Sequence, residues 1–194
     1  MGINTFYDYQ DLHQHHRTGV GFEAITNRGL EVRLNSYIRV SNQRLVKDDG
    51  VNEYYEKVAN GGDYEFGGPL PYISFLKLYG GGYWYNFGHF HNKYGWKMRM
   101  EYNPIKFSRL VFEMLDDNKR NKIGYRFEGV MTLAFTSFHP RDILKDFKAA
   151  QEAYPKINLR DKVLERVVRD FDITVITSTK AKRTGLTVEG GKGG

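Results

Sequence analysis

His89 and His91 are the residues whose types and spacing most directly suggest chemistry. We expect both on a strand over residues 83–91, where side chains two residues apart project from the same face of a sheet. Two adjacent imidazoles can bind one divalent cation. Glu101, on the next expected strand, is the candidate third ligand, which gives a predicted site for Mg²⁺ or Mn²⁺. The alternative is a pair of surface histidines at a strand end.

A second group of possible metal ligands lies in the polar N-terminal residues 1–17. Their order follows no regular spacing, so a metal site and a solvated arm are both compatible with the pattern. We expect a short helix or arm here. The possible ligands are Asp8, Asp11, His13, His15 and His16.

Aromatic residues gather between positions 79 and 96 in greater number than one sheet face can bury: Tyr79, Tyr83, Trp84, Tyr85, Phe87, Phe90, Tyr94 and Trp96. Exposed rings beside cations would form a stacking platform for single-stranded nucleic acid. The same patch could anchor a protein partner, since Tyr, Trp and Arg dominate interface hot spots. The predicted nucleic-acid-binding residues are Tyr83, Trp84, Tyr85, Lys93, Tyr94, Lys97, Arg99, Lys180, Lys182 and Arg183.

These residues are positioned by the segment Tyr72–Phe107, which we interpret as a three-stranded meander leading into a helix. The expected strands cover residues 72–79, 83–91 and 96–102, and the glycines at 80–82 are expected to form the first turn. Asn103 and Pro104 are a typical helix start, with an N-cap acceptor followed by proline in the first turn. The expected helix presents one apolar face, formed by Phe107, Leu110, Val111, Met114 and Leu115.

The remaining pattern predicts an α+β fold, an antiparallel or mixed sheet with helices packed on one face. A hairpin over 20–26 and 30–40 turns at Gly29, and its apolar alternate residues are expected to face the core. Other expected elements are helices at 51–58, 141–154 and 158–167 and strands at 125–138 and 172–178. The predicted organisation is a histidine-rich arm (1–17), one α+β domain (18–178) and a flexible, basic, glycine-rich tail (179–194).

Composition narrows the class of protein. The chain has 194 residues, a net charge of +6 and no cysteine, which excludes disulfides and thiolate metal sites. No apolar run approaches the roughly 20 residues of a membrane-spanning helix, and the N-terminus lacks the order of a signal peptide. We therefore expect a soluble, cytoplasmic protein without a membrane partner, located in a host cell if phage-encoded. The positive charge favours a phosphate-bearing partner.

Two short segments resemble the HUH endonucleases, the rolling-circle replication initiators and relaxases of phages and plasmids. The first is His89-Phe90-His91, and the second is the Arg-x-Glu-aromatic-Asn-Pro pattern within Lys97–Phe107. The resemblance covers about residues 72–110. It implies that His89 and His91 bind the metal and that Tyr154 attacks a DNA phosphate. Pro155 departs from the pattern, because it ends the expected helix directly after that tyrosine.

The sequence supports two functional hypotheses. The first is a nucleic-acid-binding protein of replication-initiator type, with single-stranded DNA as partner and with or without metal-dependent nicking. The second is a non-enzymatic, phage-type accessory or assembly protein that uses the aromatic meander as a protein interface. The motifs favour the first, whereas Pro155 directly after Tyr154 favours the second.

Overall fold

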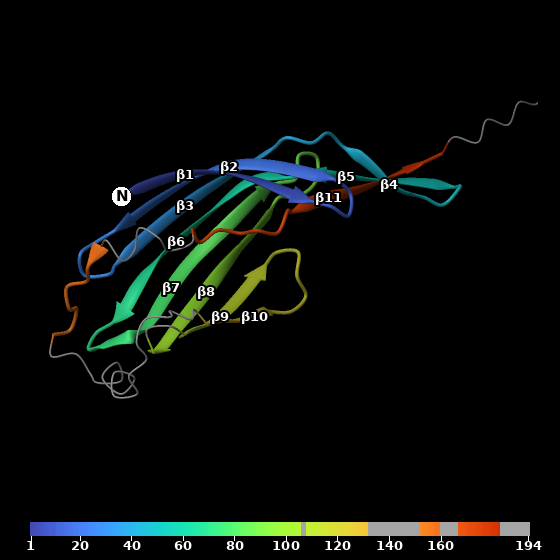
Figure 1. Ribbon diagram of the computed structural model, residues 1–194. Coiled ribbons are helices and arrows are strands. Elements are labelled where there is room, and N and C mark those ends of the chain that lie inside the picture. The colour runs from blue at the N-terminus through green and yellow to red at the C-terminus, as the bar shows by residue number, and fades with distance from the viewer. Residues whose placement is uncertain (106–107, 132–151, 160–166, 183–194) are drawn as a thin grey trace, which may run out of the picture.

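A computed structural model describes residues 1–105, 108–131, 152–159 and 167–182. The regular elements that lie wholly within these residues are all β-strands (Figure 1). The larger sheet contains β1 (Gly2–Gln10), β2 (His15–Ile25), β3 (Glu31–Arg39), β6 (Asn60–Leu70), β7 (Ile73–Asn86), β8 (Lys93–Ile105), β9 (Ser108–Asp117) and β10 (Gly124–Met131). The smaller sheet contains β4 (Arg44–Asp48), β5 (Asn52–Val58) and β11 (Val175–Ala181).

The large sheet has eight antiparallel strands in the order β1-β2-β3-β6-β7-β8-β9-β10, and the small sheet has the order β11-β5-β4. Strands β4 and β5 lie between β3 and β6 in the chain, so the small sheet is an extension of the β3–β6 connection. Figure 1 shows the large sheet curving along its length and the small sheet projecting beyond one end. Within the described residues, β1 and β10 are the two edge strands of the large sheet.

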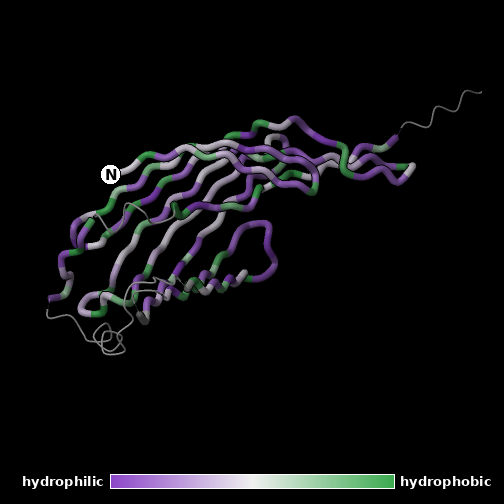
Figure 2. The backbone as a smooth tube through the Cα atoms, in the orientation of Figure 1, coloured by the Kyte–Doolittle hydropathy of each residue, from purple (hydrophilic) through white to green (hydrophobic). Residues whose placement is uncertain are grey.

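The two faces of the large sheet have the opposite polarity to those of a water-soluble protein. On β3, Val32 and Leu34 are 44% and 47% exposed, whereas Glu31 and Arg33 are 2% and 6% exposed. We call the charged, buried face the inner face and the apolar, exposed face the outer face. The outer face includes Val20, Phe22, Val32, Leu34, Ile38, Tyr64, Phe66, Leu78, Trp84, Trp96, Met98 and Met100. Figure 2 shows the resulting interleaving of polar and apolar residues along the strands.

Glycines inside the strands allow inner-face rings to lie close to the backbone of the neighbouring strand. A Cβ atom on Gly61 would collide with the ring of Tyr85, and one on Gly81 would collide with the carbonyl oxygen of Tyr64. Tyr85 is directly opposite Gly61 in the register of β6 and β7. The glycine-rich stretch at 80–82 therefore belongs to one continuous strand, β7, and the predicted turn at this point is wrong.

The predicted α+β fold is wrong for the described residues, because segments expected as helices pair as strands. Of the helix expected over 51–58, all residues but the first form β5, which is hydrogen-bonded to β4 on one side and β11 on the other. The segment expected to be a helix after Asn103 continues β8 to Ile105 and then forms β9. Its register with β9 shifts between Tyr102 and Ile105, where Pro104 has no N–H to donate. Most of the expected helices at 141–154 and 158–167 lies outside the described residues.

The expected hairpin over 20–26 and 30–40 is confirmed as β2 and β3, and Gly29 adopts a φ of 82° in the turn. Its polarity is the reverse of the prediction, because the apolar residues face outward and the charged ones are buried. Residues 1–17, expected as an arm, form β1 and the start of β2. The strand expected over 125–138 is β10 as far as Met131, and the last expected strand corresponds to β11.

Among the described residues, no helix is long and apolar enough to cross a membrane.

Candidate functional site

The inner face carries a network of ion pairs that begins at Arg33. Its Nε donates to Glu23 Oε1 at 2.6 Å and its Nη1 to Glu65 Oε1 at 2.9 Å. Its Nη2 donates to Glu31, so one guanidinium joins carboxylates on β2, β3 and β6. Such a fork of donors suits an arginine, because its planar group can serve several carboxylates at fixed angles.

Arg99 continues the network across β8. Its Nε and Nη2 donate to the two carboxylate oxygens of Glu65 at 3.0 and 2.5 Å, and its Nη1 donates to Glu101. Lys77 Nζ lies 3.7 Å from Glu101 Oε2. The guanidinium also stacks on the ring of Tyr79, 4.1 Å from its centroid. We call this set the ion-pair ladder; its members are Glu23, Glu31, Arg33, Glu65, Lys77, Arg99 and Glu101.

The inner face also holds an extended segment of the chain, residues 167–174, which precedes β11. Arg17 is fully buried and donates from Nη2 to the Asp170 carbonyl at 2.7 Å and from Nη1 to the Asp172 carbonyl at 3.1 Å. Tyr85 Oη donates to Asp170 Oδ2 at 2.8 Å. In Figure 1 this segment runs beneath β1, β2 and β3 toward the small sheet. The inner face therefore binds the backbone of this segment through the buried guanidinium of Arg17.

Among the described residues, the outer face carries no comparable network of ion pairs. Apolar and aromatic side chains lie exposed on adjacent strands, for example Leu34 on β3, Phe66 on β6, Trp84 on β7 and Met98 on β8. Soluble monomers rarely expose contiguous apolar patches larger than a few hundred Å². A surface of this extent requires an apolar partner.

The predicted metal ligands are not brought together. His89 and His91 lie on the exposed turn between β7 and β8, not on a strand. Glu101 is buried in the ion-pair ladder, eight residues beyond Lys93 at the start of β8, a distance of about 26 Å along the strand. The pairing of β7 with β8 therefore places the Glu101 carboxylate far from His89 and His91.

The predicted nucleic-acid platform is divided between the two faces of the sheet. Trp84 and Tyr94 are exposed on the outer face, whereas the Tyr85 side chain is buried. Tyr83 shares the inner face with Tyr85 and donates to Asp117 Oδ2 at 3.0 Å. The three cations point inward and have carboxylate partners: Lys93 pairs with Asp117, Lys97 with Asp63, and Arg99 with Glu65 and Glu101.

Tyr154 lies at the opposite end of the large sheet from the two histidines. Its neighbour Ala153 accepts a hydrogen bond from the backbone N–H of Tyr72, just before β7, whereas the histidine turn follows the end of β7. The 14 residues of β7 span about 45 Å. Lys180 lies on β11, Lys182 pairs with Asp48, and Arg183 is outside the described residues.

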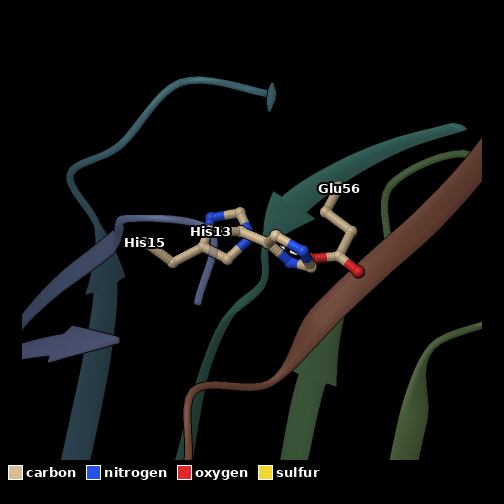
Figure 3. Close-up of side chains that lie close together, drawn as sticks. All are labelled: His13, His15 and Glu56. Atoms are coloured by element: carbon tan, nitrogen blue, oxygen red, sulfur yellow. Dashed lines mark hydrogen bonds and ion pairs between the residues drawn. The ribbon is translucent and has the colours of Figure 1, made fainter. Parts of the chain in front are cut away.

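A different histidine cluster does converge. His13 Nδ1 and His15 Nε2 lie 2.8 and 3.0 Å from Glu56 Oε2 (Figure 3). The sequence drew attention to the two histidines but could not provide their partner, because Glu56 is 41 residues from His15 and lies on the other sheet. Residues this far apart in the sequence give no local pattern that would predict the contact.

Comparison with known proteins decides the class of protein. A family model described as "Inverse autotransporter, beta-domain" matches residues 1–128. The chain belongs to this family. It is an outer-membrane β-barrel family. An outer-membrane β-barrel has apolar residues on its outside and polar residues inside, and the two faces of the large sheet show this polarity.

Two individual proteins are similar to this inverse autotransporter β-domain. An attaching and effacing protein homolog of Escherichia coli (strain K12) is 39% identical over 70 residues, which make up 36% of this chain and 23% of that protein. A structure solved in work on the in-meso crystallization of membrane proteins has a TM-score of 0.70 and 18% identity, over 91% of this chain and 73% of the solved chain. At 18% identity, the similarity to the solved structure shows a shared fold only.

The family corrects the functional predictions made from the sequence. The resemblance to HUH endonucleases is wrong, since it rested on two short segments, and with it the nucleic-acid-binding replication initiator. The soluble, phage-type accessory protein is wrong as well. The expected cytoplasmic location, and the expectation of a nucleic-acid partner and no membrane, are overturned by membership of an outer-membrane family.

Proposed function

We propose that the large sheet forms part of the wall of an outer-membrane β-barrel, with lipid against the outer face and the lumen on the inner face. The observation that carries this proposal is the inverted polarity of adjacent strands. Val32, Leu34 and Ile38 are exposed, while Glu31 and Arg33, which alternate with the first two, are buried and ion-paired. Lipid chains satisfy such an apolar surface, and a polar lumen accommodates the charges.

Strand length and backbone bonding agree with this role. A tilted strand of about 9–11 residues crosses the hydrocarbon core of a bilayer. Strands β2, β6, β7 and β8 have 11, 11, 14 and 13 residues. Because lipid cannot bond to backbone N–H and C=O groups, an open sheet edge is not tolerated there. The edges of β1 and β10, which have no partner strand among the described residues, therefore have to be paired in the barrel.

The inner face supports a second part of the proposal, that the lumen accommodates polypeptide, as the description "autotransporter" suggests. Arg17 donates to two backbone carbonyls of the segment 167–174, and Arg169 Nη1 pairs with Asp8 Oδ1 at 2.6 Å. The two bonds from Arg17 to backbone carbonyls do not depend on the sequence of the bound segment, whereas the Asp8–Arg169 pair does. A face built in this way suits a lumen through which a segment passes.

Lipid and water accessibility along β3 tests the proposed orientation. The chain has no cysteine, so single cysteines at residues 32–38 can carry spin labels without background. With the protein folded into lipid vesicles, we expect labels at Val32, Leu34, Ser36 and Ile38 to be relaxed by oxygen, which concentrates in lipid. A label at Asn35 should instead respond to a water-soluble nickel chelate. Equal accessibility at alternate positions, or preferential exposure of the outer positions to the chelate, would overturn the proposal.

A further inference from the structure

We propose that His13, His15 and Glu56 form a binding site for a divalent transition metal ion of the zinc class. The three residues offer two imidazole nitrogens and one carboxylate, and these ligand atoms lie within 4.8 Å of one another (Figure 3). The site is separate from the lipid-facing surface and from the ion-pair ladder. It joins the large sheet to the small one.

The local backbone explains why the two histidines converge. They flank Gln14 in the turn between β1 and β2, where the N–H of Gln14 donates to the Asp11 carbonyl at 3.1 Å. Gln14 adopts a φ of 50°, in the left-handed region that a non-glycine residue occupies only when its surroundings hold it there. Its side-chain Oε1 accepts a bond from Arg44 Nη1 on β4 at 3.3 Å. The turn is thereby held against the small sheet, and both rings point toward β5.

The distances fit a shared ion. Zinc binds imidazole nitrogen at about 2.0–2.1 Å and carboxylate oxygen at about 2.0–2.2 Å, which places tetrahedral ligands roughly 3.3 Å apart. The nitrogens of His13 and His15 are 2.8 and 3.0 Å from Glu56 Oε2. A movement of a few tenths of an ångström, about what side-chain torsions allow, opens this space for an ion.

Two of the three ligands are shielded from solvent. The Glu56 side chain is 17% exposed. His15 is fully buried, and its Nδ1 has no hydrogen-bond partner among the described residues. When Nε2 binds the ion, the remaining ring proton lies on Nδ1, so this unpaired N–H is a cost that metal binding has to offset.

The donor set indicates the class of ion. Imidazole nitrogens favour zinc, copper, nickel and iron, whereas Mg²⁺ and Mn²⁺ prefer oxygen. The His13 side chain is 30% exposed, so a fourth position opens toward solvent and can take water. A plain hydrogen-bonded cluster is the competing interpretation. A metal site would bind added Zn²⁺ in a fixed ratio to the protein, whereas a hydrogen-bonded cluster would not.

Metal titration of the untagged full chain, folded in detergent micelles, tests the site. Calorimetry with Zn²⁺ alone is expected to give one equivalent bound. Co²⁺ as a second probe should give the intense visible absorption of a four-coordinate site. Glu56→Gln and His13→Ala are each expected to weaken Zn²⁺ binding by about tenfold or more, since even loss of a partner behind a ligand weakens metal affinity 10–100-fold.

The double substitution His89→Ala/His91→Ala is the matched control, because it removes two exposed histidines on a turn and should leave binding unchanged. Circular dichroism confirms that each variant retains its strands. The conservative Glu56→Gln change keeps the size of the side chain, so the comparison does not depend on a disruptive variant. Absence of stoichiometric Zn²⁺ binding by the wild-type chain would overturn the proposal. Binding that survives both ligand substitutions, or that is lost in the control, would overturn it as well.

Discussion

In the large sheet, Arg33 and Arg99 form ion pairs while almost fully buried. At the small sheet, Lys182, which follows β11, and Asp48 on β4 form an ion pair in contact with solvent. The Lys182 Nζ and Asp48 Oδ2 atoms are 2.5 Å apart, as close as Arg99 Nη2 and Glu65 Oε1. Distance therefore does not distinguish the two sheets. The difference lies in the surroundings, since water screens the exposed pair and a buried charge without a partner is costly.

Removing an arginine from the ladder should produce the largest contrast between the sheets. Arg99→Ala leaves Glu65 and Glu101 with one fewer buried cation and is expected to destabilise the folded protein by about 3–5 kcal/mol. Urea unfolding in vesicles, followed by the fluorescence of Trp84 and Trp96, measures this. Lys182→Ala, which breaks the exposed pair, should leave the transition unchanged. Equal effects from the two substitutions would show that burial does not set the energetic weight of these pairs.

The outer face provides the second contrast. Leu34→Arg places a charge against lipid and is expected to cost about 2–4 kcal/mol if the position lies near the middle of the bilayer. Leu45→Arg on β4 changes an equally exposed leucine of the small sheet and should have little effect, because its surroundings are aqueous. The same unfolding measurement in vesicles compares them. A tolerated arginine at position 34 would argue against lipid contact.

Adjacent glycines on β7 sharpen the comparison within one strand. Gly81→Ala would drive a methyl group into the backbone of Tyr64 on β6, and overpacking of this kind costs about 1–3 kcal/mol. Gly80→Ala faces open space, since no atom lies within 4 Å of its Cβ position. Unfolding midpoints of the two variants should therefore differ. If both are tolerated, the inner face is less tightly packed than the structure shows.

The smallest expected effect concerns Glu56, where the two sheets meet. Its pKa in the folded protein lies below the ordinary value of 4.5, so its bonds to His13 and His15 stabilise the fold above that pH. The stabilisation is lost as pH falls below about 4.5 and through the folded-state pKa. The difference in unfolding free energy between the wild type and Glu56→Gln, measured from pH 7 to pH 3, should shrink toward the acid end. A difference that grows on acidification would contradict this assignment.

Alternation along the strands could be predicted from the sequence, but the side that meets the solvent could not. On β3 the pattern of Val32, Leu34 and Ile38 against Glu31 and Arg33 is the same whether the apolar half faces a core or a lipid bilayer. A pairing of opposite charges on neighbouring strands, such as Arg33 with Glu23 and Glu65, is the signal that could have favoured a polar interior.

Helix and turn signals failed where strand pairing is stronger than local preference. Val51, Tyr54, Tyr55 and Val58 match a helical spacing, yet β4 and β11 hold this segment on both sides as β5. Asn103-Pro104 matches a helix start, yet the register shift at the end of β8 accommodates the proline. Neither neighbour is visible in a local window, and the carboxylate at Glu56 was missed for the same reason.

The alternation of apolar and polar residues on strands such as β3 means that a continuous apolar surface is created by folding. On the unpaired β3, Val32, Leu34 and Ile38 are each followed by a polar residue, so this strand alone has no continuous apolar surface. Only hydrogen bonding between neighbours aligns Leu34, Phe66 and Trp84 into one continuous surface. The unfolded polypeptide can therefore stay in water, and its insertion into a bilayer is coupled to the pairing of its strands.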